Sequence, residues 1–244
     1  MLRISNIEKE NLMRKSLKNK KPIAGGSRKQ TITWNKIPTQ GVIVINGHRG
    51  EGKSALGWWL AQKMQQKTGK KVAAMGMPTE AQKVFPKRGF GRGGIQFVND
   101  LETISRLKPS IIICDEAAFL AGARRAMSKT NQDWLKLINI CRHKDHLLIF
   151  IHQQSRQLDV QIMMDADLVL MKRPTQLHLR GARAELAPEI KEAYDLFASM
   201  RGNTKKKVYV VDYHYGAKAM LSASMPTWWT DKVSKAYSSV DIGA

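Results

Sequence analysis

Residues 41–60 read GVIVINGHRGEGKSALGWWL, and this stretch decides the fold. It opens with a short apolar run that ends at Asn46, which is typical of a buried strand. Apolar residues at helical spacing follow, so a helix is expected from residue 53 to residue 68, before Gly69. Residues 47–54, where the strand gives way to the helix, have the pattern G-x-x-x-x-G-K-S. A strand, this pattern and a helix in that order predict a loop that holds phosphate groups.

Each residue type in this loop has a chemical task. Glycines at positions 47, 50 and 52 allow backbone amides to turn toward an anion, and the new helix adds its positive end. Lys53 is expected to reach the β and γ phosphates of ATP, and Ser54 to offer its hydroxyl to Mg²⁺. The side chains at the variable positions, His48, Arg49 and Glu51, are expected to point outward. The predicted nucleotide-binding residues are Gly47, His48, Arg49, Gly50, Glu51, Gly52, Lys53, Ser54 and Ala55.

A second acidic motif, SIIICDEAAF, spans residues 110–119. A buried strand delivers Asp115 at its carboxyl end, where the carboxylate can hold Mg²⁺ together with Ser54. Glu116 is the predicted general base, which orients and polarises the attacking water. This base favours a hydrolase over a small-molecule kinase, because a kinase must keep water out. The alternative is that the two acidic residues only cap the next helix through its dipole.

A third motif, RHKDHLLIFIHQQSRQLD, spans residues 142–159. Its strand ends at His152, and Gln153 is the candidate that senses the γ-phosphate and positions water; the alternative is an ordinary loop residue. Arg142 is the candidate arginine finger, supplied by a neighbouring subunit, because its guanidinium is always charged and forked. Alternatively, Arg142 is a solvated cation at a helix end. The rival fingers are Arg124, Arg125 and Arg156.

The order of these motifs resembles the FtsK–HerA superfamily of DNA-pumping ATPases, and the resemblance covers residues 41 to about 172. Gln153 matches the glutamine of the family's last motif, whereas His152 stands where a threonine is common. The spacing from Arg142 to that glutamine also fits. The compact size and the Arg142-His143 start are similar to viral genome-packaging ATPases of tailless, membrane-containing viruses. The zonula-occludens-toxin-like proteins of filamentous phage assembly are similar as well.

This resemblance implies an α/β fold of the RecA-like (ASCE) P-loop NTPase type and a ring-shaped homo-oligomer, a hexamer or a pentamer. Double-stranded DNA would pass through the ring, with ATP sites at subunit interfaces and the arginine given in trans. The expected function is a motor that packages viral double-stranded DNA into a preformed capsid. A capsid or portal-vertex protein is a further expected partner, and the host cytoplasm or the virion vertex is the expected location.

Two other functions are kept as alternatives. The first is a morphogenesis or export ATPase of the filamentous-phage type; such proteins usually span a membrane, and no apolar window here is long enough. The second is a nucleic-acid-binding protein whose nucleotide site only regulates assembly.

Cys114 and Cys141 are isolated thiols whose spacing does not suggest a metal site.

The rest of the chain predicts alternating strands and helices, which implies a mostly parallel central sheet covered by helices on both faces. Further strands are expected at 71–76, 95–98, 110–115, 147–152, 167–171 and 207–213, and further helices at 131–141, at 189–200 and from a cap at Asn99 through Leu107. Three parts are expected: a basic N-terminal arm (1–38), a P-loop ATPase domain (39–222) and a C-terminal tail (223–244). Trp228 and Trp229 in the tail either pack on the body or dock on a neighbour.

Positive charge dominates the composition, with 41 Lys and Arg against 20 Asp and Glu and a net charge of +21. Such an excess favours polyanionic partners, because each phosphate contact releases counterions. Lys87, Arg88 and Arg92 lie in the glycine-rich loop KRGFGRGG and are predicted to contact the DNA backbone; the alternative is a surface loop. A second basic cluster, Arg201 with residues 205–207, is interpreted as a solvated hairpin. Few aromatics lie among the basic runs, which favours duplex DNA over stacked single strands.

Overall fold

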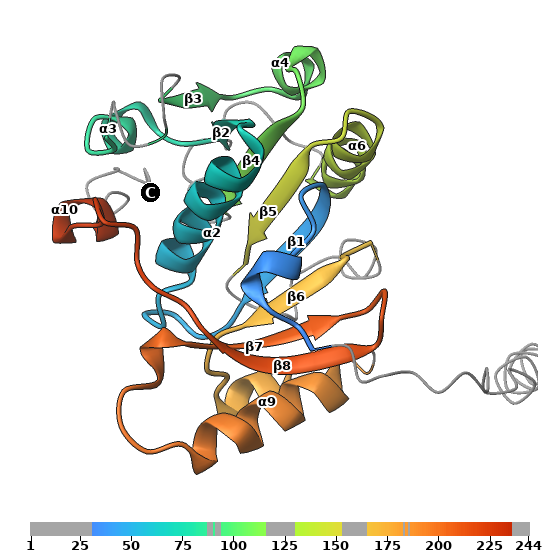
Figure 1. Cartoon of the computed structure of the whole chain (residues 1–244), viewed down its shortest axis with the longest axis vertical. Helices are drawn as coiled ribbons and strands as arrows, with labels where there is room; N and C mark the ends of the chain where they lie inside the picture. The colour runs from blue at the N-terminus through green and yellow to red at the C-terminus, as the bar shows by residue number, and fades with distance from the viewer. Residues whose placement is uncertain are drawn as a thin grey trace, which may run out of the picture. The chain divides into compact units, whose positions relative to one another are not determined.

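A single mixed sheet of eight strands organises the described part of the chain (Figure 1). The computed structural model describes residues 31–86, 90, 94–115, 130–152, 165–182, 184 and 186–235, with the backbone only for 130–134. The strand order is β3-β2-β4-β5-β1-β6-β7-β8, in which the first six strands pair in parallel, β7 is antiparallel to β6, and β8 is antiparallel to β7. The strands are β1 Gly41–Asn46, β2 Lys71–Met75, β3 Ile95–Val98, β4 Ser110–Asp115, β5 Leu147–Ile151, β6 Leu168–Met171, β7 Lys207–Asp212 and β8 Ala217–Ser222. The predicted mostly parallel α/β sheet is confirmed.

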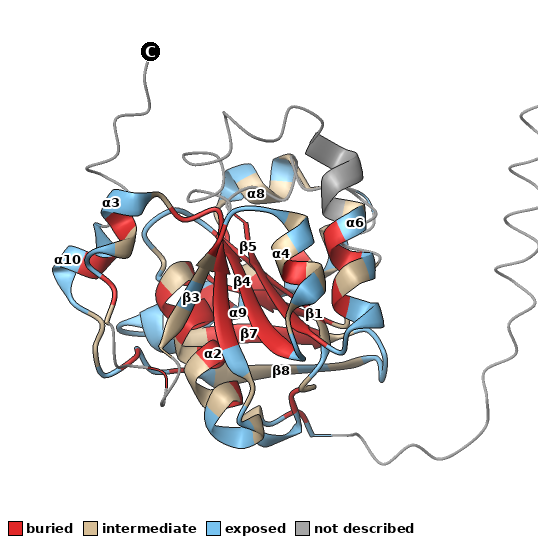
Figure 2. Ribbon diagram, turned by 90° about the horizontal axis from the view of Figure 1, so that it is seen from above, coloured by how far each residue is buried: buried red, intermediate tan, exposed pale blue. Residues whose placement is uncertain are grey.

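Helices cover both faces of this sheet, because its central strands are apolar on both sides. Helix α2 packs on one face, and α4, α6 and α9 pack on the other, so the strands are buried between two helical layers (Figure 2). The α-helices are α2 Lys53–Thr68, α3 Thr79–Gln82, α4 Leu101–Arg106, α6 Thr130–His143, α8 Gln176–Arg180, α9 Ala187–Ser199 and α10 Asp231–Ser234; the 3₁₀ turns are η1 Trp34–Lys36 and η3 Thr204–Lys206. Within these ranges no helix is both long and apolar enough to cross a membrane.

The predicted elements agree with the observed ones to within a few residues. The strand expected at 71–76 ends at Met75, because Gly76 turns away with a φ of 71°. Strand β8 was not predicted. It forms a hairpin with β7, and its sequence AKAMLS has no β-branched residue that would mark a strand.

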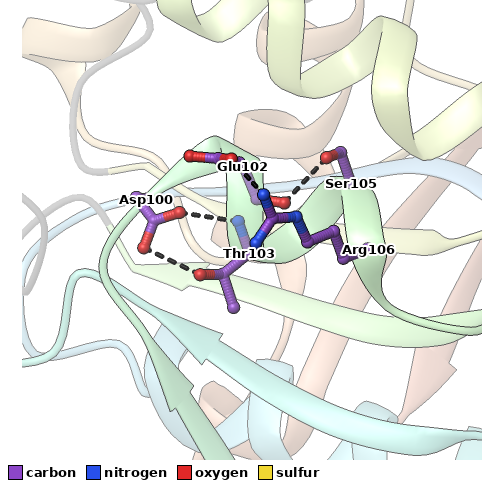
Figure 3. Close-up of polar contacts among 5 residues, drawn as sticks. All are labelled: Asp100, Glu102, Thr103, Ser105 and Arg106. Carbon is purple, nitrogen blue, oxygen red and sulfur yellow. Dashed lines mark hydrogen bonds and ion pairs between the residues drawn. The ribbon is translucent and has the colours of Figure 1, made fainter.

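Helix α4 corrects a predicted cap. The cap is Asp100, not Asn99: the Asp100 carboxylate accepts a hydrogen bond from the Thr103 backbone N–H at 2.6 Å and from the Thr103 hydroxyl at 2.9 Å (Figure 3). The backbone hydrogen bond from Thr103 lowers the pKa of Asp100. Glu102 and Arg106 form an exposed ion pair one turn apart on the same helix. Asn99 and Asp100 are both residue types that cap helices, and in the structure it is the Asp100 side chain that reaches the free amide.

Segments on both sides of residues 39–222 take part in the core. Ile32 and Ile37 are buried against the face that α2 covers, and Trp34 meets the Trp59 ring edge-on at 4.8 Å between centroids. At the other end, the Trp228 ring lies 5.6 Å from the Phe90 ring, measured between centroids. Trp228 therefore packs on the body, which decides between the two alternatives for this residue.

Candidate nucleotide-binding site

The candidate site lies at the edge of the sheet where the parallel strands end. Strand β5 lies between β1 and β4, and the three strands are in parallel register. The loop that follows β1 and the acidic residue that ends β4 therefore flank the end of β5. Ligands of open α/β sheets bind at the carboxyl ends of their strands.

The loop between β1 and α2 is built on glycines with positive φ. Gly47 has a φ of 141°, and Gly50 and Gly52 each have a φ of 82°. Gly52 is the left-handed cap of α2, and its carbonyl accepts the backbone N–H of Leu56 at 3.0 Å. Residues with a side chain rarely adopt these φ angles, so glycine is required where the backbone must curve around an anion.

Lys53 is buried, and its side chain is hydrogen-bonded to the backbone of this loop. Its ammonium donates hydrogen bonds to the carbonyl oxygens of Gly47, at 2.8 Å, and of His48, at 3.0 Å. His48 and Arg49, at variable positions of the motif, are exposed. The arrangement holds a cation at the start of a helix with the loop wrapped around it, which fits the charge of a triphosphate.

Ser54 and Asp115 meet across the site. The Ser54 hydroxyl donates a 2.6 Å hydrogen bond to Oδ2 of Asp115, which is 4% exposed. Among the described residues, no group of three or more His, Cys, Asp and Glu side chains could hold a metal ion. One hydroxyl and one carboxylate fit Mg²⁺ nevertheless, because this ion usually takes few protein ligands besides phosphates and water.

His152 directly follows Ile151 of β5, which is the register partner of Asp115 in β4. It is buried, its backbone N–H donates to the Ile45 carbonyl at 2.8 Å, and its ring stacks on Phe150 with 6.1 Å between centroids. Glu116 and Gln153 come directly after Asp115 and His152 in the chain. They lie outside the described residues, as do Lys87, Arg88, Arg92, Arg124, Arg125 and Arg156.

Arg142 lies at the opposite edge of the sheet from this site. It belongs to the last turn of α6, which ends just before β5 begins. Its guanidinium donates to the Asp165 carboxylate and to the Asp165 carbonyl, each at 2.9 Å. The fold therefore separates Arg142 from the Lys53 of the same chain by the length of β5.

Two features of the site were missed by the sequence reasoning. Lys172, which follows β6, is 2% exposed, and burial lowers its pKa to about 8 while the charge of Glu51 opposes the shift. A cavity of about 300 Å³ opens beside the loop. Its lining includes Glu51, Arg173, Pro174, Thr175, Tyr194 and Phe197. The available signal was the polar run 172–176 directly after an apolar strand, which is the same kind of signal that marked Asp115.

Comparison with known proteins shows a likeness in structure only. No known protein family and no curated protein matches the sequence. The genome packaging NTPase B204 from Sulfolobus turreted icosahedral virus 2 is similar over 77% of this chain and 98% of its own, with a TM-score of 0.55 and 14% identity. The DNA-packaging ATPase B204 from Sulfolobus turreted icosahedral virus is similar over the same shares, with a TM-score of 0.53 and 16% identity.

The pCW3 conjugation coupling protein TcpA is similar over 82% of this chain and 65% of its own, with a TM-score of 0.50 and 13% identity. At these identities the likeness establishes the fold. The predicted RecA-like P-loop fold is confirmed, and the predicted resemblance to viral genome-packaging ATPases holds at the level of the fold.

Proposed function

We propose that this chain is an ATP-hydrolysing motor that translocates double-stranded DNA and packages a viral genome into a preformed capsid. One observation carries the proposal. The hydroxyl of Ser54 and the carboxylate of Asp115 are 2.6 Å apart, beside a buried Lys53 at the start of a helix. This is the combination of groups that binds Mg²⁺ and the phosphates of a nucleoside triphosphate in P-loop hydrolases.

Each group has a role in the proposed hydrolysis. The loop amides and Lys53 hold the phosphates, and Ser54 and Asp115 hold Mg²⁺, which neutralises charge on the phosphates when it is bound. Glu116 orients the attacking water, and Gln153 senses the γ-phosphate. The cavity beside Glu51 takes the adenine base of ATP, since Tyr194 and Phe197 give the cavity an aromatic wall and Thr175 gives it a polar group.

The coupling to DNA rests on charge and on the structural neighbours. The net charge of +21 favours a polyanionic partner. Two of the similar structures are described as genome-packaging or DNA-packaging enzymes, and a third as a conjugation coupling protein. The proposed assembly is a homo-oligomeric ring that meets a capsid or portal-vertex protein in the host cytoplasm or at the virion vertex.

The test is the rate of ATP hydrolysis with and without duplex DNA, together with the native mass of the protein. We expect duplex DNA to raise the rate and the mass to correspond to a ring. Glu116→Gln should lower the hydrolysis rate by about 100-fold or more while ATP still binds. If duplex DNA leaves the rate unchanged, the chain is a nucleotide-regulated binding protein and not a motor; if Glu116→Gln hydrolyses ATP normally, the assigned base is wrong.

A further inference from the structure

The basic segment 201–207 lies at the same edge of the sheet as the phosphate loop. It reads RGNTKKK and contains four positive charges and no acidic residue. It leads into β7, which is antiparallel to β6. The amino end of β7 therefore lies beside the carboxyl end of β6, and β6 pairs with β1, the strand before the loop.

The backbone of this segment is held at residues 205–207, whereas most of its side chains are exposed. The buried ammonium of Lys172 donates to the carbonyl of Lys205 and, at 2.9 Å, to the carbonyl of Lys207. The carbonyl of Lys206 accepts the backbone N–H of Ala223 at 2.8 Å. Three successive carbonyls are thus held, while the side chains of Arg201, Lys205 and Lys206 are exposed. The segment therefore presents three positive side chains to solvent next to a backbone that Lys172 holds in place.

Lys172 also contacts the beginning of the phosphate loop. Its backbone N–H donates to the Asn46 carbonyl at 2.8 Å. A Cβ atom added to Gly47 would lie 2.7 Å from the Cβ of Lys172, so the two residues are packed backbone to side chain. The carbonyl of the next residue, Arg173, accepts the His48 N–H at 3.4 Å. A single residue therefore spans from the loop that holds the nucleotide to the basic segment.

We propose that Arg201, Lys205 and Lys206 contact the backbone phosphates of duplex DNA, and that Lys172 couples this surface to the phosphate loop. The inference rests on the proposed function and adds a DNA-contacting surface to it. The segment has charge but no aromatic side chain, so it suits phosphates and not stacked bases. Movement of the loop when nucleotide binds would pass through Lys172 to the carbonyls beneath the basic side chains.

The surface is tested with matched charge variants. Arg201→Gln, Lys205→Gln and Lys206→Gln are combined, and the control combines Lys71→Gln, Lys108→Gln and Lys144→Gln, which are exposed residues at the opposite edge of the sheet. Both variants lose three positive charges. For a labelled DNA duplex, we expect the slope of log affinity against log salt to fall by about 2 to 3 in the first variant only. Equal slopes in the two variants would overturn the surface, as would a loss seen only with single-stranded DNA or RNA.

The coupling is tested in the unmodified chain and in one variant. Addition of a non-hydrolysable ATP analogue with Mg²⁺ should slow amide exchange in residues 204–207 by about fivefold or more. Lys172→Met should bind duplex DNA but show a smaller ratio of DNA-stimulated to unstimulated hydrolysis. Unchanged exchange in residues 204–207 of the wild type overturns the coupling even if the variant does not fold. Absence of any DNA-stimulated hydrolysis in the wild type would instead refute the proposed function, and the two failures are therefore distinguishable.

Discussion

Gly47 combines two requirements that the motif pattern alone does not separate. Its φ of 141° belongs to a region that residues with side chains rarely adopt. It also lies against Lys172, whose carbonyl oxygen would be 2.9 Å from an added Cβ. Gly50 has a positive φ of 82° as well, but no atom lies within 4 Å of the Cβ position. The two glycines therefore distinguish backbone strain from steric overlap.

The same substitution at these two glycines should have different effects on stability. We expect Gly50→Ala to lower the free energy of unfolding by about 1 kcal/mol, which is the cost of a left-handed residue. Gly47→Ala should lower it by about 3 kcal/mol or more, because overlap with Lys172 adds to the strain. Urea unfolding monitored by tryptophan fluorescence measures both. Equal losses would mean that the contact with Lys172 is not tight.

Lys172 should make stability depend on alkaline pH. Burial lowers its pKa from an ordinary value of about 10.4 to about 8, with Glu51 as the opposing charge. Below pH 8 both the folded and the unfolded chain carry the proton, so this residue adds no pH dependence there. Between pH 8 and pH 10 the unfolded chain binds the proton more strongly, and stability rises with pH by about 1 kcal/mol per pH unit.

The comparison with Lys172→Met isolates this effect, because other groups titrate in both proteins. The difference in unfolding free energy, wild type minus variant, should be constant from pH 6 to pH 7.5 and should rise from pH 8 to pH 10. Urea unfolding at each pH gives the two curves. Parallel curves over the whole range would show that the Lys172 ammonium is not desolvated in the folded chain.

At the level of elements, the spacing between α2 and the sheet depends on Gly57. An added Cβ at this position would lie 2.5 Å from the Cδ1 of Ile151 in β5, which is 1% exposed. Gly57→Ala gains about 1 kcal/mol in helix propensity but overpacks the core, which costs about 1–3 kcal/mol. We expect a net loss in the free energy of unfolding, because the buried Ile151 has little room to move.

The double variant Gly57→Ala with Ile151→Val tests this explanation. Removing the Cδ1 atom should make Gly57→Ala neutral or stabilising relative to Ile151→Val alone. Thermal and urea unfolding of the four proteins in the cycle measure the coupling between the two positions. Additive effects would show that α2 moves away from the sheet as a whole, and that Ile151 is not the point of contact.

The sequence predicts elements well where one physical signal dominates. The strands β3 and β4 and the helix α2 have the bounds that were expected, since apolar runs and a glycine stop mark them. The weak strand β8 could not be predicted, because its pairing with β7 and not its composition makes it a strand. The cap at Asp100 depends on which of two neighbouring side chains reaches an amide, and such geometry is not readable from residue type.

The candidate site also has a part that the sequence predicts and a part that it does not. The meeting of Ser54 and Asp115 followed from two motifs whose strands end at one edge. The role of Lys172 could not be predicted, because its partners are backbone carbonyls in a segment more than 30 residues away. Hydrogen bonds to backbone leave no mark on the sequence of the accepting residues.

At the level of the whole molecule, the parallel sheet separates two kinds of residue. The loop between β1 and α2, Asp115 and His152 lie at the edge where the parallel strands end. Arg142 lies at the edge where β5 begins, and its side chain is 45% exposed while it is paired with Asp165. A guanidinium has five N–H donors, so Arg142 keeps donors for a further anion. If it acts on a phosphate, the geometry requires that the phosphate belong to another subunit.

A ring with head-to-tail interfaces would meet this requirement, because each interface joins two different edges of the chain. We expect Arg142→Ala and Lys53→Ala each to abolish DNA-stimulated hydrolysis when tested alone. Equal mixtures of the two variants should recover up to about a quarter of the wild-type rate, since a random ring forms that share of sites with both groups intact. The control mixes Arg142→Ala with Arg142→Ala/Lys53→Ala, which leaves every arginine absent. Recovery in the test mixture alone requires that one subunit supply the arginine and its neighbour the phosphate loop, whereas no recovery would leave Arg142 as a structural partner of Asp165.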